Sequence, residues 1–290
     1  MTKARYFSVL VVLLLLVGGC FMTGCKSADA ENPEHNANMT HDSIAYDLRI
    51  AVLPTLEALP IYYAKQTGIC DSLGITIEIL PYMAQFDCDT ALFNKTADVS
   101  MMDRTRFSDY ISKGRKLSAQ LNIDTHYALV ASADLWAKRV RALRNRTIAI
   151  SRHSGAEAFC LHELELAGLK REDVHFPQIN DVWLRADMLT NHQVDAAVLP
   201  WLQAYWAALN GHQILKEQDI LPEAAMQLVY LSNSKKIEKI TLLAKAYELG
   251  KAEIEKNDFR ICRDILIQEY LIPVAQTDSI IKKLPKPCKE

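Results

Sequence analysis

An acidic and a basic side chain stand together where an apolar run ends. Met101 and Met102 close that run, and Asp103 and Arg104 follow directly. An aspartate there could accept hydrogen bonds from an amine or a sugar-like hydroxyl, and an arginine could hold a carboxylate or sulfonate with two parallel bonds. The two side chains could instead bond to each other, or cap the next helix. We expect Asp103 and Arg104 to contact a small ligand.

A second polar loop follows the apolar run 148–150 and opens a helical stretch. Free backbone N–H groups at a helix start attract anions, and here Ser154 adds a hydroxyl donor while Gly155 lets a ligand approach closely. Arg152 lies in the same loop. We therefore predict a site for an anion or a carbonyl at Ser154 and Gly155, with Arg152 as a further contact.

Two more candidate residues follow prolines at the ends of apolar runs. Thr55 follows Pro54, and it could cap the next helix with its hydroxyl or face a ligand. Trp201 follows Pro200 and offers a flat apolar wall for a ring or a cation, although it could equally pack inside its own lobe. We predict ligand contacts for both. Arg185, on a helical stretch, is expected to lie on a solvated face.

An internal repeat places these positions in two similar units. The order strand, helix, strand over residues 48–81 recurs about 98 residues later, over 146–177. The next element repeats as well, since the apolar run that starts after Asp98 matches the run after Asp195. The repeat predicts two lobes of like topology.

The predicted fold class is α/β, with two lobes that each hold a mostly parallel sheet flanked by helices. Right-handed crossovers place the loops after the strands at one edge, where such sheets bind ligands. Strands expected at 117–123, 126–131 and 226–231 would cross between the lobes as a two-strand hinge. We assign 46–132 to lobe one, 133–224 to lobe two, and 225–290 to a return with helices that pack on lobe one.

The N-terminus predicts export and a lipid anchor. Lys3 and Arg5 precede a short apolar run, 6–17, and two cysteines follow it. Either cysteine fits a bacterial lipobox, and we favour Cys25 over Cys20 because polar sequence begins directly after Cys25. An ordinary cleaved signal peptide is the alternative. Residues 1–25 are thus read as a lipoprotein signal and 26–45 as a flexible tether.

Composition excludes several other classes of protein. The formal net charge is −2, which favours neither a nucleic-acid partner nor a polybasic membrane patch. Five cysteines follow the lipobox in scattered positions, and the histidines have no paired spacing, so we expect no metal site and no cofactor. A disulfide among the five cysteines is allowed, but its pairing cannot be assigned; they are Cys70, Cys88, Cys160, Cys262 and Cys288.

Three segments resemble one known family. They are the strand start 50–55, the segment 58–65 with Gly68, and the run 184–200. Together they resemble type II periplasmic solute-binding proteins of ABC importers, in the branch for nitrate, taurine, alkyl sulfonates and thiamine-type pyrimidines, over residues 46–285. The resemblance implies a ligand between the lobes, touched by the loops after the first strand, after Asp103 and after Ser151.

The expected function follows from the anchor and the resemblance. A monomeric lipoprotein of the cell envelope would capture a sulfonate, another anion, a zwitterion or a pyrimidine, and deliver it to an ABC permease. The alternative is a same-fold enzyme of pyrimidine or menaquinone-type metabolism. The chain has no nucleophile elbow and no glycine-rich phosphate loop, and those pathways are cytoplasmic, so we expect no enzyme.

Overall fold

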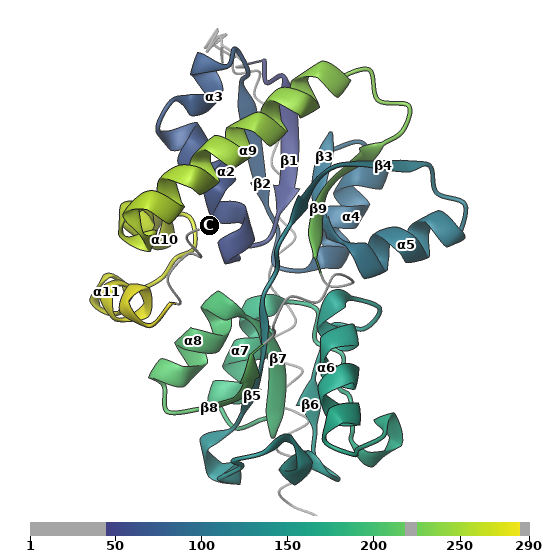
Figure 1. Cartoon of the computed structure of the whole chain (residues 1–290), viewed down its shortest axis with the longest axis vertical. Helices are drawn as coiled ribbons and strands as arrows, with labels where there is room; N and C mark the ends of the chain where they lie inside the picture. Colours follow the sequence, from purple (N-terminus) through teal and green to yellow (C-terminus); the bar gives the residue numbers. More distant parts are fainter. Residues whose placement is uncertain (1–44, 218–224, 285–290) are drawn as a thin grey trace, which may run out of the picture. The chain divides into compact units, whose positions relative to one another are not determined.

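The computed structural model describes residues 45–217 and 225–284 (Figure 1). The predicted signal peptide, both lipobox cysteines and residues 26–44 of the predicted tether lie outside the described residues, as does Cys288. Cys70, Cys88, Cys160 and Cys262 are buried free thiols. In the described ranges, no helix combines the length and the apolar character that crossing a bilayer requires.

The first sheet has five strands in the order β2-β1-β3-β9-β4. Strand β1 runs parallel to β2 and β3, whereas β9 runs antiparallel to both β3 and β4. The three central strands are buried almost throughout, as their continuous apolar sequences predict. The strands are β1 (Leu48–Val52), β2 (Ile77–Pro81), β3 (Val99–Asp103), β4 (Leu117–Ile123) and β9 (Met226–Leu231).

Helices from both ends of the described chain pack against the first sheet and share one apolar core with β1. The long helix α9 lies on α2, with Gly250 so close to the Pro60 carbonyl that a Cβ there would stand 2.4 Å from the oxygen. The Tyr270 hydroxyl donates to the Thr55 carbonyl at 2.7 Å. The helices are α2 (Leu59–Gln66), α3 (Ile69–Ser72), α4 (Gln85–Phe93), α5 (Arg104–Ser112), α9 (Ile237–Asn257), α10 (Arg263–Gln268) and α11 (Val274–Lys283).

The second sheet has four strands in the order β6-β7-β5-β8. Strand β6 runs parallel to β7, and β5 runs antiparallel to both β7 and β8. The segment 173–177 was predicted as a strand, but only His175 in it forms a single β-bridge beside β6. Gln178, just after the segment, forms another. The elements are β5 (Tyr127–Ala131), β6 (Ile148–Ala149), β7 (Ala196–Pro200), β8 (Gln213–Glu217), α6 (Gly155–Leu166), α7 (Val182–Thr190) and α8 (Trp201–Leu209).

The two sheets repeat one plan, in agreement with the sequence repeat. In each sheet a parallel pair, β1 with β3 or β6 with β7, is followed by a strand antiparallel to it, β9 or β5. That strand in turn pairs antiparallel with the edge strand β4 or β8. The turns repeat too: Gly114 and Gly211 both have positive φ, at 83° and 90°, after equivalent helices. The predicted two-lobed α/β fold is confirmed at the level of two helix-flanked sheets.

The chain passes from the first sheet to the second through residues 124–126, between β4 and β5. The predicted boundary at residue 132 therefore lies too late, because β5 belongs wholly to the second sheet. Its five residues are all buried, and it sits between β7 and β8. The chain returns to the first sheet between β8 and β9, and residues 218–224 of this return lie outside the described residues.

Candidate ligand-binding site

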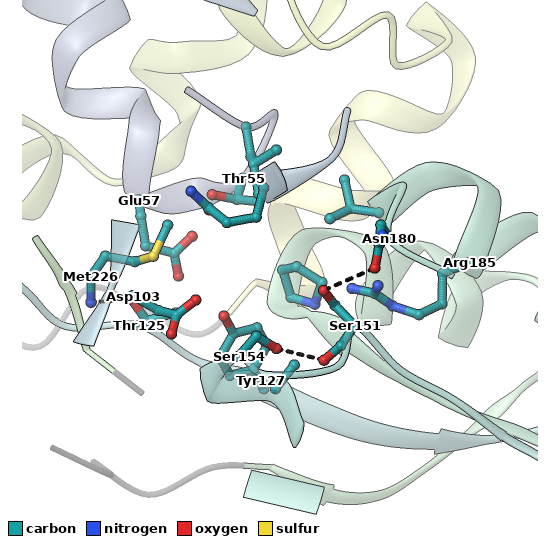
Figure 2. A pocket seen from close by; sticks show the side chains of 15 residues that line it. Thr55, Glu57, Asp103, Thr125, Tyr127, Ser151, Ser154, Asn180, Arg185 and Met226 are labelled. Carbon is teal, nitrogen blue, oxygen red and sulfur yellow. Dashed lines mark hydrogen bonds between the residues drawn. The ribbon is translucent and has the colours of Figure 1, made fainter. Parts of the chain in front are cut away.

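A cavity of about 30 Å³ lies where the strands of both lobes end. The loop after β1, the end of β3 and the start of α4 line it from the first lobe, and β5, the loop after β6 and the start of α7 line it from the second. The polar side chains around it are those of Thr55, Glu57, Gln85, Asp103, Thr125, Tyr127, Ser151, Ser154, Asn180 and Arg185 (Figure 2).

Asp103 links the two lobes through one carboxylate oxygen. It is the N-cap of α5, and its Oδ1 accepts from the Arg106 backbone N–H at 3.0 Å. The same Oδ1 accepts from the Gly155 N–H, the first residue of α6, at 3.1 Å. Its Oδ2 accepts no hydrogen bond from residues 45–217 or 225–284. Asp103 therefore offers the cavity an acceptor that none of the described residues uses.

Burial sets the protonation of this carboxyl. Asp103 is only 2% exposed, and its desolvation raises the pKa to about 7, although the backbone N–H and the charge of Arg106 act in the opposite direction. Asp89 lies nearby and adds to the increase. The group can thus be charged or neutral near neutral pH, whereas an exposed aspartate would be fully ionised.

A buried ion pair supports Asp103 from behind. Arg106 donates through Nε to Asp89 at 2.7 Å, and the Gln85 amide donates to the other Asp89 oxygen at 3.0 Å. Tyr110 completes the cluster by bonding both Arg106 and Asp89. Because Asp89 already pairs with Arg106, this arginine neutralises Asp103 only in part.

Arg185 lies on the opposite side of the cavity and is 2% exposed. Its guanidinium donates to the carbonyls of Val198, at 2.7 Å, and of Ile179. It forms no salt bridge with any residue that the structure describes. Burial lowers its pKa to about 10. A guanidinium this deeply buried normally has an anionic partner, and the prediction of a solvated face for Arg185 is wrong.

The Tyr127 hydroxyl lies between the two kinds of charge. Burial raises its pKa beyond the usual range; Asp103 and Glu57 add to the increase, while Arg185 acts against it. Glu57 is itself buried and accepts from the His126 N–H at 3.3 Å. Figure 2 shows Glu57 and Asp103 at one end of the cavity and Arg185 at the other.

The cavity is thus polarised, with more acid than base. Glu57 and Asp103 are its acidic lining residues, and Arg185 is the one basic residue among the described lining residues, so with all three ionised the lining carries a net charge of −1. Ser151 and Asn180, which bond each other at 3.4 Å, accompany Arg185. Such a site offers acceptors at one end and donors at the other.

Comparison with known proteins identifies the family. A family model described as NMT1/THI5 like matches residues 56–252. The chain belongs to this family. No curated protein sequence matches it.

Solved structures show how widely the fold of this NMT1/THI5-like chain occurs. The alkanesulfonate-binding protein SsuA of Xanthomonas axonopodis, bound to MOPS, matches with a TM-score of 0.65 at 16% identity, over 82% of this chain and 84% of that one. The periplasmic aliphatic sulphonate-binding protein SsuA of Escherichia coli matches with 0.62 at 16%, over 82% and 84%. A lipoprotein of Treponema pallidum matches with 0.57 at 18%, over 72% and 94%. The resemblance to type II periplasmic solute-binding proteins is confirmed at the level of the fold.

Three of the residues predicted from the sequence of this NMT1/THI5-like protein line the cavity: Thr55, Asp103 and Ser154. Asp103 caps α5, as one of the two readings of the sequence allowed, whereas the local roles of Thr55 and Ser154 differ from those expected. The Thr55 hydroxyl caps no helix, and Ser154 donates to the Ser151 carbonyl at 2.7 Å. Whether they touch a ligand stays a prediction.

The predicted anion site at the start of α6 is already occupied by the protein. The Gly155 N–H, expected to be free, donates to Asp103. The backbone N–H of His153 is bonded as well, to Glu157 at 2.6 Å. An anionic ligand therefore has to compete with Asp103 for this helix start, which the sequence alone did not reveal.

The other three predicted contacts lie outside the cavity. Arg104 is exposed, because the first residue of α5 points away once Asp103 caps the helix. Arg152 is also exposed and donates to the Phe176 carbonyl at 2.9 Å. Trp201 stacks on His126, with ring centroids 3.9 Å apart, and only its neighbour Pro200 lines the cavity. The structure does not bring these three side chains into the cavity lining, and ligand contacts for them stay a prediction.

Sequence reasoning missed Glu57, Tyr127, Asn180 and Arg185. For Arg185 a signal existed, since it shares a helix face with Val182 and Leu189, which are buried. Tyr127 begins a wholly apolar strand, and nothing in its sequence context distinguishes a cavity-facing hydroxyl from a core ring.

Proposed function

We propose that the chain is an extracytoplasmic solute-binding protein that captures a small molecule between its two lobes. The observation that carries the proposal is the polarised cavity at the strand ends, where both lobes contribute charged side chains. A solute there would contact both lobes at once. We further propose Thr55, Asp103 and Ser154 as ligand contacts, joined by Glu57 and Arg185.

The kind of protein among the structural relatives supports a receptor over an enzyme. The Xanthomonas and Escherichia proteins are sulfonate-binding proteins by name. In this chain, the buried thiols Cys88 and Cys160 have their pKa raised by burial, which makes them poor nucleophiles. A same-fold enzyme is therefore the weaker alternative.

Capture would work by closure of the two lobes. Residues 45–123 and the C-terminal helices 225–284 would move as one lobe, and 127–217 as the other, with 124–126 as one flexible passage. Besides the Asp103–Gly155 bond, the lobes meet where Gln203 donates to the Pro54 carbonyl at 2.8 Å and Val182 N–H to the Met83 carbonyl at 3.0 Å. A ligand would favour closure only by binding the closed form better than the open one.

Delivery would take place at a membrane. We propose that residues 1–25 direct export, that Cys25, or alternatively Cys20, receives the lipid, and that 26–45 tether a monomeric receptor in the cell envelope beside an ABC permease. The Treponema relative, a lipoprotein by name, supports the anchor. Metabolic labelling with an alkyne fatty acid tests it: Cys25→Ser should abolish labelling, while Cys20→Ser should keep it. If Cys25→Ser is labelled and Cys20→Ser is not, Cys20 is the lipidated residue.

A thermal-shift screen of the full chain, purified in mild detergent, tests solute binding. A ligand that binds only the folded state stabilises it by mass action, by about 2.7 kcal/mol at a concentration 100 times its Kd. The melting temperature rises as a result. We expect at least one compound among amino acids, sulfonates, inorganic anions and pyrimidines to do so. Chemical turnover of a hit would favour the enzyme, and a flat response across the library would contradict the receptor.

A further inference from the structure

The start of α6 in the second lobe offers backbone N–H groups to an anion, and the Asp103 carboxylate from the first lobe already occupies it. Its Oδ1 accepts from Gly155 across the cavity, while its Oδ2 stays free of described donors. A second buried carboxylate, Glu57, lies at the same end. We propose that Asp103 determines the ligand class: it keeps anionic groups away from this end and selects a ligand with a protonated nitrogen there. This inference rests on the proposed solute-binding function.

Charge at the acidic end favours a cation there. An anionic group placed against Asp103 and Glu57 would face two carboxylates in a site of low dielectric, where like charges repel strongly. An ammonium group would instead donate to the free Asp103 Oδ2. It would also favour the ionised form of Asp103, whose desolvation the Arg106 charge and the two backbone N–H groups compensate only in part.

The opposite end needs a group of the other sign. Arg185 is buried without a salt bridge in the described ranges, and Nε and Nη1 together use only two of its five donors. Ser151 and Asn180 lie beside it. An acidic or carbonyl group of the ligand would accept from the remaining guanidinium donors and neutralise the charge. The ligand is therefore a small dipolar molecule, with its amine at Asp103 and its acidic group at Arg185.

The size and the walls of the cavity restrict the ligand further. About 30 Å³ holds on the order of two water molecules, so the lobes have to separate even for glycine, and further for a larger ligand. Trp201 stacks on His126 and does not offer a flat wall for a heterocycle. A short amino acid or amino sulfonate fits these conditions better than a pyrimidine.

Two pairs of probes that differ by one ammonium group test the proposal: glycine against acetate, and taurine against ethanesulfonate. Calorimetric titration uses the full chain in detergent, with Asp103→Asn as the variant. Asparagine keeps an oxygen for both backbone N–H groups and removes the charge. Asp109→Asn, on the exposed part of the same helix α5, is the control with the same change in net charge.

We expect at least one zwitterion to bind the wild type at least tenfold more tightly than its matched anion. A hydrogen bond to a charged group contributes about that factor or more. Asp103→Asn should reduce the ratio at least tenfold, and Asp109→Asn should leave it unchanged. If Asp103→Asn fails to fold, Asp103→Ser is used in its place. The ratio of zwitterion to anion affinity in the wild type still tests the selection without any variant.

Four results would overturn the inference in distinguishable ways. Equal binding of anion and zwitterion by the wild type refutes the selection while solute binding stands. An unchanged ratio in Asp103→Asn refutes the role of Asp103. No binding of any probe to any variant, together with a flat response in the library screen, removes solute binding and this inference with it; library hits without a basic nitrogen remove the inference alone.

Discussion

The two lobes are built alike away from the cavity and differ at it. Asp98 accepts from the Arg49 N–H at 2.9 Å, and Asp195 accepts from the Thr147 N–H at the same distance. In both lobes this bond fixes the first strand beside the third, at the end remote from the ligand. A repeated sequence here produces a repeated contact, because both copies have the same structural task.

At the cavity the equivalent positions have diverged. Strand β3 ends in Asp103, which caps α5, whereas β7 ends in Pro200, which offers no side-chain cap. Among the described residues that line the cavity, the buried arginine, Arg185, comes from the second lobe, and the buried carboxylates Asp103 and Glu57 come from the first. The comparison teaches that the repeated residues build the frame, while the residues that differ between the lobes polarise the cavity.

The strongest way to break this comparison is to remove the basic end. We expect Arg185→Met to weaken binding of the best zwitterion by about 100-fold, because the acidic group of the ligand loses charged hydrogen bonds. Arg185→Lys should bind weakly as well, since an ammonium group cannot serve two carbonyls and a ligand in the same planar geometry. Titration calorimetry measures both. Arg141→Met, an exposed arginine in the same lobe, is the control, and equal losses in both methionine variants would contradict the account.

The ionisation of Asp103 at the acidic end should make the free energy of unfolding depend on pH. The pKa of Asp103 is about 7 in the folded chain, against an ordinary value of 3.8, so between these values the folded state binds the extra proton. The free energy of unfolding should thus fall as pH rises through this window. Between pH 5 and pH 8 the wild type should lose about 2 to 3 kcal/mol more than Asp103→Asn.

Urea unfolding at the two pH values measures this difference. The charged neighbours of Asp103, which are Glu57, Asp89 and Arg106, are unchanged in the variant and cancel to first order in the comparison. Parallel pH profiles for the wild type and Asp103→Asn would show that Asp103 is ionised throughout this pH range. The preference of the site for a protonated nitrogen would then depend on geometry alone.

The C-terminal helices have no counterpart in the second lobe, which gives a third test. In Gly250→Ala a Cβ would stand 2.4 Å from the Pro60 carbonyl oxygen, so α9 must move away from α2. We expect a loss of about 1 to 3 kcal/mol in urea unfolding. Lys245→Ala, at an exposed position of α9, should change stability little. Full stability of Gly250→Ala would show that α9 is not packed as described.

The smallest effect tests the repeated contact itself. Asp98→Asn and Asp195→Asn should each cost about 1 to 2 kcal/mol, because a buried backbone N–H loses a charged acceptor. The two losses should be similar, since Asp98 also pairs with Lys236 at 2.9 Å and Asp195 also accepts from the Thr147 hydroxyl at 2.9 Å. Neither should change ligand affinity. A change in affinity from either variant would mean that the frame and the site are not separate.

The repeat made most of the fold predictable from the sequence. Apolar runs followed by polar loops identified β1, β3 and β7, because buried strands leave a continuous pattern. The boundary between the lobes was placed too late, because an apolar run such as β5 fits the centre of either sheet.

The candidate site was predictable only in part. Strand ends identified Thr55, Asp103 and Ser154, since topology places them at one edge. Arg152 and Trp201 occupy similar places in the sequence, yet their side chains turn to Phe176 and His126. Side-chain direction and contacts between the lobes depend on tertiary packing, and no local pattern encodes them.

A crystal structure of the chain grown with glycine or taurine, whichever binds more tightly, tests the central claim most directly. The account predicts density in the cavity, with the ligand nitrogen within hydrogen-bonding distance of Asp103 and the acidic group at Arg185. A ligand bound elsewhere, or bound with its acidic group against Asp103, would contradict it.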